Sequence, residues 1–312
     1  MEITDLPAAS ACLERIGYYR LSGYWYPFRK SRISTNPVTG QILINPTTRK
    51  PQLIVDDNFR PGTTFQQVMD LYVFDKRLRL QFLDAIERVE VALRVDIALM
   101  LGARNPWAHR DPKQLHGNFA LKLDPRTGQT KFQSWLDRLD STFDRSKEEF
   151  VKHFKLKYAG EKLPIWIAIE LWDFGMLSTF LSGMKVNDLQ TLAQKYALPR
   201  VDLLTTWIRN INNVRNICAH HSRLWNRSPA DQPSPPKQGE IQALNHLAFD
   251  RVAQSRIYAT AAVLQYFLKK IHPASSWGSR LREYCTTFPT SSTCNLAQAG
   301  FAPNWEQQSL WN

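Results

Sequence analysis

The sequence predicts a mainly α-helical protein, and three observations lead to this fold class. Apolar residues recur at spacings of three, four and seven residues in several long segments, as they do on amphipathic helices. Stretches rich in proline and turn residues separate these segments. Alternating strand patterns are absent except near the N-terminus. With 43% hydrophobic and 22% charged residues among 312, the chain has a globular composition, which excludes a disordered protein.

The first 60 residues are predicted to form an aromatic and basic segment. Six aromatic residues lie between Tyr18 and Phe28, interleaved with Arg20 and followed by Arg29. We expect most of these rings in the core, because six adjacent exposed rings would favour aggregation, and one or two could stack on bases. Residues 32–58 carry the turn signals NPVTG and NPTTRKP around the apolar runs ILIN and QLIV. That pattern is typical of a short β-hairpin or an ordered loop.

A long helix is predicted from Thr63 to about Leu101. Thr63 and Gln66 fit a capping box, in which each side chain accepts a hydrogen bond from the backbone of the other residue. Apolar residues from Leu71 to Leu93 then follow at three-, four- and seven-residue spacings, so they share one face of the helix.

Further helices are predicted for five later segments, and the chain divides into three parts. The helical patterns cover residues 132–158, 164–183, 186–197, 202–225 and 244–271, with loops at 102–128 and a proline-rich break at 228–239. The predicted parts are the N-terminal segment (1–60), a helical domain (61–290) and a C-terminal tail (291–312).

The cysteines and the apolar segments predict a cytoplasmic protein without a metal or cofactor. The four cysteines form no CxxC pair and have no histidine at ligand spacing, so a zinc site is not expected. Scattered thiols are typical of a reduced compartment, and the first residues lack the pattern of a signal peptide. The most apolar stretch, residues 163–181, contains Glu170 and Asp173, which favours a buried helix over a membrane span.

The net charge of +12 is concentrated in two segments without acidic residues. Residues 15–55 carry seven basic side chains and residues 203–230 carry four, while the rest of the chain is close to neutral. Such a distribution favours a polyanion partner, although an ordinary solvated face explains any single Lys or Arg. The candidate RNA-contacting residues are Arg20, Arg29, Lys30, Arg32, Arg209, Asn212, His221, Arg223 and Arg227.

The stretch from Thr206 to Arg227, TWIRNINNVRNICAHHSRLWNR, is the strongest candidate for a functional site. Asn212, Asn216 and His220 are four residues apart, so an ideal helix places them on one face. Asparagine is a poor helix former, so these asparagines lower the helix propensity of the segment without an evident structural gain. Such a cost suggests a functional surface. Arg215 and His220 are five residues apart and lie roughly 140° around the helix from one another, so a second copy of this helix could complete the site.

These residues carry a resemblance to known families. The sequence from Arg215 to His220, RNICAH, resembles the R-N-x-x-x-H motif of HEPN domains, many of which are metal-independent ribonucleases. The segments IGYYRLSGYWYPFR, LPIWIAIELWDFG and VRNICAHHSRLWNR are similar to the Abi-like family of bacterial abortive-infection proteins, of the AbiD/AbiF type. The likeness extends from about Leu13 to Arg227. Members usually carry a longer lead before the aromatic block, which suggests a shortened N-terminus here.

The resemblance implies a HEPN-type helical bundle, a homodimer and a toxin-like, anti-phage endoribonuclease. Arg215, Asn216 and His220 are the implied catalytic residues. Their chemistry suits RNA cleavage without metal, because imidazole transfers protons near neutral pH and the guanidinium fork fits phosphate oxygens. Expected products are a 2′,3′-cyclic phosphate and a 5′-hydroxyl.

Three alternatives stay open at this point. His221 rather than His220 could be the motif histidine. Arg215 and His220 could be structural hydrogen-bonding groups. The protein could also be a non-cleaving RNA-binding module that holds a structured small RNA on the same basic face, in which case its binding depends steeply on salt.

Overall fold

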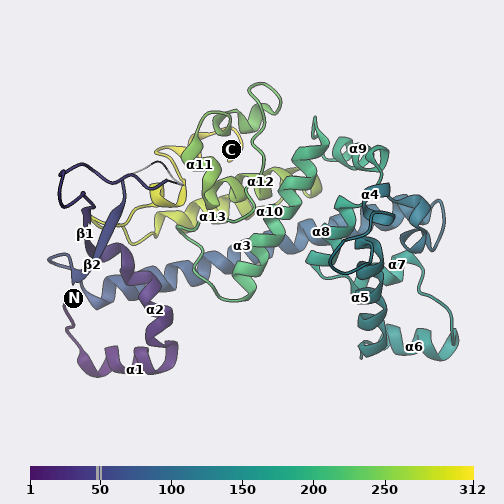
Figure 1. Cartoon of the computed structure of the whole chain (residues 1–312), viewed down its shortest axis with the longest axis horizontal. Coiled ribbons are helices and arrows are strands. Elements are labelled where there is room, and N and C mark those ends of the chain that lie inside the picture. Colours follow the sequence, from purple (N-terminus) through teal and green to yellow (C-terminus); the bar gives the residue numbers. More distant parts are fainter. Residues whose placement is uncertain (47–48, 50) are drawn as a thin grey trace.

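The computed structural model describes residues 1–46, 49 and 51–312, and it confirms the prediction of a mainly α-helical protein with a short β-hairpin (Figure 1). Part of the predicted 32–58 hairpin, residues 47, 48 and 50, lies outside the described residues. The N-terminal elements are α1 (Leu6–Ile16), α2 (Tyr18–Trp25), β1 (Arg29–Ile33) and β2 (Leu53–Phe59). The two strands pair antiparallel, with Ser31 opposite Val55 and Ile33 opposite Leu53.

The longest helix, α3 (Phe65–Gly102), runs through the whole molecule and organises it. Its 38 residues span about 57 Å at 1.5 Å per residue. In Figure 1 the N-terminal elements lie at one end of α3 and α4 to α9 lie at the other. The later elements are α4 (Gly117–Ala120), α5 (Lys131–Arg145), α6 (Glu149–Lys157), α7 (Ile165–Ala168), α8 (Phe174–Ser182), α9 (Val186–Lys195), α10 (Val201–Ala219), α11 (Arg251–Ser255), α12 (Ile257–Ile271) and α13 (Trp277–Thr286).

The capping box of α3 begins one residue later than predicted. Thr64 is the N-cap: its hydroxyl accepts a hydrogen bond from the Gln67 backbone N–H at 3.2 Å, and the Gln67 side chain accepts from the Thr64 N–H at 3.0 Å. The sequence TTFQQ contains the same Thr-x-x-Gln spacing twice, so spacing alone does not decide between the two threonines. The backbone carbonyl of Thr63 instead accepts a hydrogen bond from the N–H of Glu2.

Two of the predicted continuous helices are interrupted by aspartates that act as N-caps. Residues 164–183 form α7 and α8 because the Asp173 side chain accepts a hydrogen bond from the Met176 N–H and starts a new helix. In the 244–271 segment, Asp250 accepts from the N–H groups of Val252 and Ala253 and starts α11. The apolar spacing continues through both breaks, so the spacing did not reveal them.

One hydrophobic cluster joins the N-terminal segment, α3, α10, α12 and the end of the chain. Tyr24, Trp25 and Phe28 of the aromatic block are buried in it, whereas Tyr18, Tyr19 and Tyr26 are exposed. Residues 291–312 also contribute to this core, through Phe301, Trp305, Leu310 and Trp311. Among the helices described, none has both the length and the apolar character that a bilayer span needs.

Candidate functional site

Helix α10 ends at Ala219, inside the RNICAH motif and earlier than the predicted end near Trp225. The backbone N–H of His221 donates to the Cys218 carbonyl at 3.1 Å, and the N–H of Ser222 donates to the Ile217 carbonyl at 3.0 Å. These two bonds form a Schellman motif, with His220 as the C-cap and His221 in the left-handed conformation at φ 57°. His220 therefore lies at the C-cap, where its N–H still donates to the Asn216 carbonyl at 2.9 Å, and the chain turns out of the helix at His221.

A buried carboxylate on α3 holds the chain that follows this turn. Asp75 accepts hydrogen bonds from the backbone N–H groups of Leu224 and Trp225, the latter at 2.7 Å. It also accepts from the Tyr24 hydroxyl at 2.6 Å and from the Arg79 guanidinium at 2.5 Å. Burial raises the pKa of the Asp75 carboxyl, while the hydrogen bond from Tyr24 and the charge of Arg79 act in the opposite direction. The hydrogen bonds that Asp75 accepts thus fix the turn to α2 and α3.

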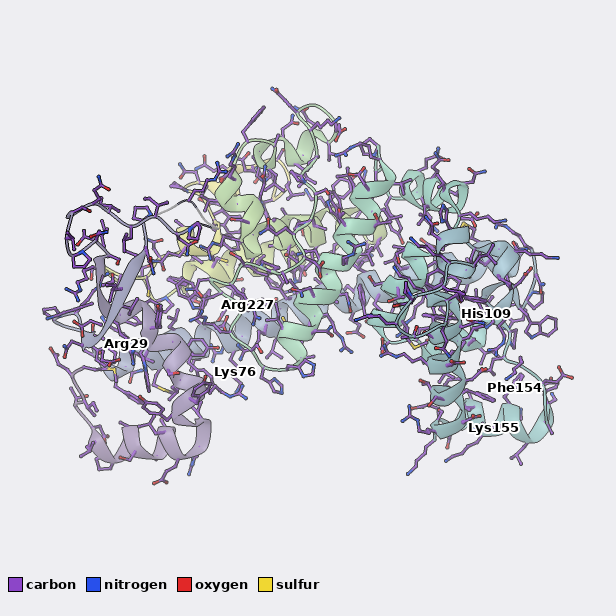
Figure 2. All side chains as sticks on the ribbon, in the orientation of Figure 1. Arg29, Lys76, His109, Phe154, Lys155 and Arg227 are labelled. Carbon is purple, nitrogen blue, oxygen red and sulfur yellow. The ribbon has the colours of Figure 1, made fainter. Side chains whose placement is uncertain are left out.

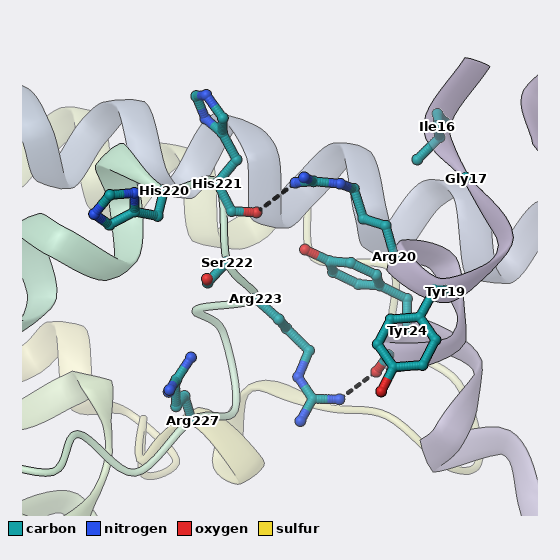
Figure 3. Close-up of a pocket in the computed structure, with 11 residues that line it drawn as sticks. Ile16, Gly17, Tyr19, Arg20, Tyr24, His220, His221, Ser222, Arg223 and Arg227 are labelled. Atoms are coloured by element: carbon teal, nitrogen blue, oxygen red, sulfur yellow. Dashed lines mark hydrogen bonds between the residues drawn. The ribbon is translucent and has the colours of Figure 1, made fainter.

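Two arginine contacts tie the same turn to α2. Arg20 donates to the backbone carbonyl of His221 at 2.9 Å, and Arg223 donates to the backbone carbonyl of Gly23 (Figure 3). Burial lowers the pKa of the Arg223 guanidinium. Two segments about 200 residues apart in the sequence therefore share one site.

Between α2 and the end of α10 lies an open pocket of about 680 Å³. Figure 3 shows side chains of α2 on one side of it and those of the turn on the other. Its lining includes the cationic groups of Arg20, Arg223 and Arg227, and no carboxylate is among the lining residues in the described part of the chain. The ring of Tyr19 is 89% exposed beside it. The lining residues are Ile16, Gly17, Tyr19, Arg20, Gly23, Tyr24, His220, His221, Ser222, Arg223 and Arg227.

The pocket brings together five of the twelve candidate residues, from two distant segments. They are Arg20, His220, His221, Arg223 and Arg227. The basic residues of β1 are not among them, and Arg29 forms an ion pair with Asp57 at 2.9 Å. Figure 2 shows Arg29 at the hairpin, apart from Arg227. Arg209 and Asn212 lie on α10 and do not line the pocket.

Arg215 and Asn216 also lie outside this pocket, and Arg215 belongs to a different environment. The Arg215 guanidinium donates to the Asn216 side-chain carbonyl at a long 3.4 Å. Its charge acts on Glu90 of α3: burial raises the pKa of that carboxyl, and Arg94 and Arg215 oppose the shift. Arg94 in turn contacts Glu90 at 2.5 Å. Within one chain, therefore, the two ends of the R-x4-H motif face different surroundings.

The sequence carries no local signal for the residues that build the pocket wall and its support. Tyr24, Asp75 and Arg79 carry no motif, and their pairing arises only from the packing of α2 against α3. Tyr19 belongs to the aromatic block, where exposure was not predicted for individual rings. Cys218, inside the motif, is buried, and burial raises the pKa of its thiol to about 12, so it does not supply a thiolate nucleophile.

Comparisons with known proteins identify one family. A family model described as Abi-like protein matches residues 11–226, a span that contains α2, α3, α10 and every residue of the pocket except Arg227. No curated protein and no solved structure matches the chain. Among the residues that the structure describes, no group of three or more His, Cys, Asp or Glu side chains is placed to hold a metal ion.

Proposed function

This chain belongs to the Abi-like family, and on that premise we propose that it acts in abortive infection by binding RNA and cleaving it without a metal ion. The observation that carries the proposal is the pocket at the end of α10. Two imidazoles and three guanidinium groups line it, without a carboxylate among the described lining residues. Such a set of side chains fits a phosphate chain, because guanidinium groups bind phosphate oxygens and imidazoles transfer protons at neutral pH.

In the proposed reaction His220 transfers a proton, and Arg215 with Asn216 stabilises the charge on the phosphate. Arg215 does not line this pocket in its own chain, so in this proposal the Arg215 of a second copy completes the site. An exposed apolar row on α3, formed by Val91, Val95 and Leu99, supports a homodimer. These residues alternate along α3 with Glu90 and Arg94, which lie in the environment of Arg215.

The test is cleavage of single-stranded RNA by purified protein in the presence of EDTA. We expect cleavage that EDTA does not reduce, with products ending in 2′,3′-cyclic phosphate and 5′-hydroxyl. Arg215→Ala and His220→Ala should each abolish it, while Arg126→Ala serves as a control because Arg126 lies in a remote exposed turn. Cleavage that persists in both variants, prepared in the same way, overturns the proposal.

A second candidate function is an RNA-binding module that does not cleave. The separation of Arg215 from the His220 pocket within one chain favours it, since a protomer by itself then holds an incomplete motif. This function predicts that a defined RNA co-purifies intact with the protein, and that the same RNA is recovered from the His220→Ala variant. Sequencing the nucleic acid bound to both proteins distinguishes the two functions.

A further inference from the structure

His221 has a backbone conformation that glycine usually adopts at the end of a helix. Its φ of 57° places it in the left-handed region, at the C′ position of the Schellman motif that ends α10. A side chain there suffers steric repulsion that glycine avoids. Both hydrogen bonds of the motif, and the bond from Arg20 to the His221 carbonyl, use backbone atoms and would form equally well with glycine. The fold therefore gives no reason for an imidazole at this position.

The imidazole of His221 is placed for use by a ligand. His221 and His220 are both exposed, and both line the cationic pocket. Neither imidazole takes part in a hydrogen bond or an ion pair within the described part of the chain, whereas the neighbouring Arg20 and Arg223 are anchored to backbone carbonyls. Figure 3 shows the two rings extending from adjacent positions of one turn. The fold does not use the ring of His221, and that ring is therefore free to act on a ligand beside His220.

We propose that His221 is the second proton-transfer group of this site, so that one chain carries both the general base and the general acid. The proposal rests on the RNA cleavage proposed above, and it deepens that function. One neutral imidazole takes the proton of the ribose 2′-hydroxyl as the 2′-oxygen forms a bond to phosphorus. The bond from phosphorus to the 5′-oxygen breaks, and the other imidazole, protonated at the start, gives its proton to that oxygen. The two histidines end with exchanged protonation states, and proton exchange with water restores them.

The test replaces His221 by residues that tolerate the left-handed conformation, His221→Gly and His221→Asn. The matched control is Ala197→Gly, because Ala197 has a φ of 53° and closes an equivalent Schellman motif at the end of α9, outside the residues of the pocket. Glycine relieves the same steric repulsion in both places, so His221→Gly and Ala197→Gly should both raise the melting temperature. Cleavage should fall by about 10²- to 10⁴-fold in both His221 variants and stay unchanged in Ala197→Gly.

Binding is measured in parallel with an RNA that carries a 2′-deoxy nucleotide at the cleaved position and cannot react. We expect its Kd for the His221 variants to stay within about threefold of the unchanged protein, since general acid–base catalysis acts on the chemical step. Cleavage by His221→Gly at the rate of the unchanged protein overturns the role of His221 and leaves the proposed function standing. A loss of cleavage that equals the loss of binding also overturns it. If the unchanged protein binds RNA and never cleaves it, the proposed function and this inference both fail.

Discussion

The most unusual titratable residue outside the pocket is His109, which is fully enclosed near the end of the molecule opposite Arg29 (Figure 2). Its ring lies 6.1 Å from that of Trp172, and neither ring nitrogen has a hydrogen-bond partner in the part of the chain that the structure describes. Burial lowers the pKa of His109 to about 3, and the positive charge of Arg110 acts in the same direction. The folded protein therefore contains a neutral imidazole at this position.

His109 should make the protein less stable as the pH falls. Its folded pKa of about 3 lies below the unfolded value of about 6.5, so the unfolded state binds the additional proton between these values. The contribution of the neutral His109 to the free energy of unfolding is fully present above about pH 6.5. The linkage relation gives a loss of about 2 kcal/mol of this contribution at about pH 5. Urea unfolding at neutral pH and at about pH 5 measures it. His109→Leu should reduce the pH dependence by this amount, and an unchanged dependence in the variant would contradict the assignment.

At the scale of residues, the sequence predicted those parts of the pocket that lie close together along the chain. His220, His221, Arg223 and Arg227 fall within eight residues, and the absence of acidic neighbours marked them as candidates. Their support by Asp75 could not be predicted, because a carboxylate on a helix that is 149 residues earlier gives no local signal of its target. His109 showed no ligand spacing, and its burial depends on tertiary packing alone.

At the scale of elements, the start of α3 depends on one threonine hydroxyl. Thr64→Ala removes the acceptor for the Gln67 N–H, and a lost N-cap costs about 1 kcal/mol. Thr64→Ser keeps the oxygen and should retain nearly all of the stability. Urea unfolding of the two variants checks this assignment. Equal losses in both would show that the methyl group, and not the cap, is what stabilises the helix start.

The cluster around Asp75 should control whether the turn after α10 is ordered. Asp75→Asn leaves the buried Arg79 without a counter-ion and replaces an acceptor oxygen by a donor, so we expect a loss of about 3–5 kcal/mol in the free energy of unfolding. Tyr24→Phe removes one hydrogen bond to Asp75 and should cost about 1 kcal/mol. Tyr26→Phe is the control, because Tyr26 is exposed. Chemical denaturation measures the free energy of unfolding of all three variants. An Asp75→Asn variant as stable as the unchanged protein would show that Asp75 does not hold the turn after α10.

The helices themselves were largely predictable, whereas their ends were not. The apolar spacing identified α3, α9 and α10, because a buried face has to repeat with the helical period. The end of α10 at Ala219 follows from the left-handed His221, and a histidine is not a residue from which such a C-terminus can be predicted. The starts of α8 and α11 were equally unpredictable. Asp173 and Asp250 cap these helices, but the apolar spacing continues past both aspartates and does not mark a helix start there.

At the scale of the whole molecule, α3 explains how two basic segments become one site. Both α2 and α10 pack against this helix, so the segments 15–55 and 203–230 meet although they are far apart in the chain. Charge counting predicted that each segment carries part of the basic excess, but not that Arg20 and Arg223 would meet while Arg29 pairs with Asp57. That selection depends on which helix faces are in contact, a property of the packed molecule.

The basic pocket also determines how the proposed RNA binding should respond to salt. Each phosphate contact with a single strand contributes about −0.7 to the slope of log Kobs against log salt concentration. Arg227 is exposed at the pocket and forms no ion pair among the described residues, so its guanidinium is free to bind a phosphate. Arg227→Ala should therefore weaken binding at low salt and make the slope shallower by about 0.7. Fluorescence anisotropy of a labelled single-stranded RNA, from about 50 to about 200 mM KCl, measures both quantities.

Arg126→Ala removes the same charge from a remote turn, where Arg126 lies 3.8 Å from Asp124, and should leave the slope unchanged. If the two variants change the slope equally, RNA binds the net charge of the whole protein and not this pocket.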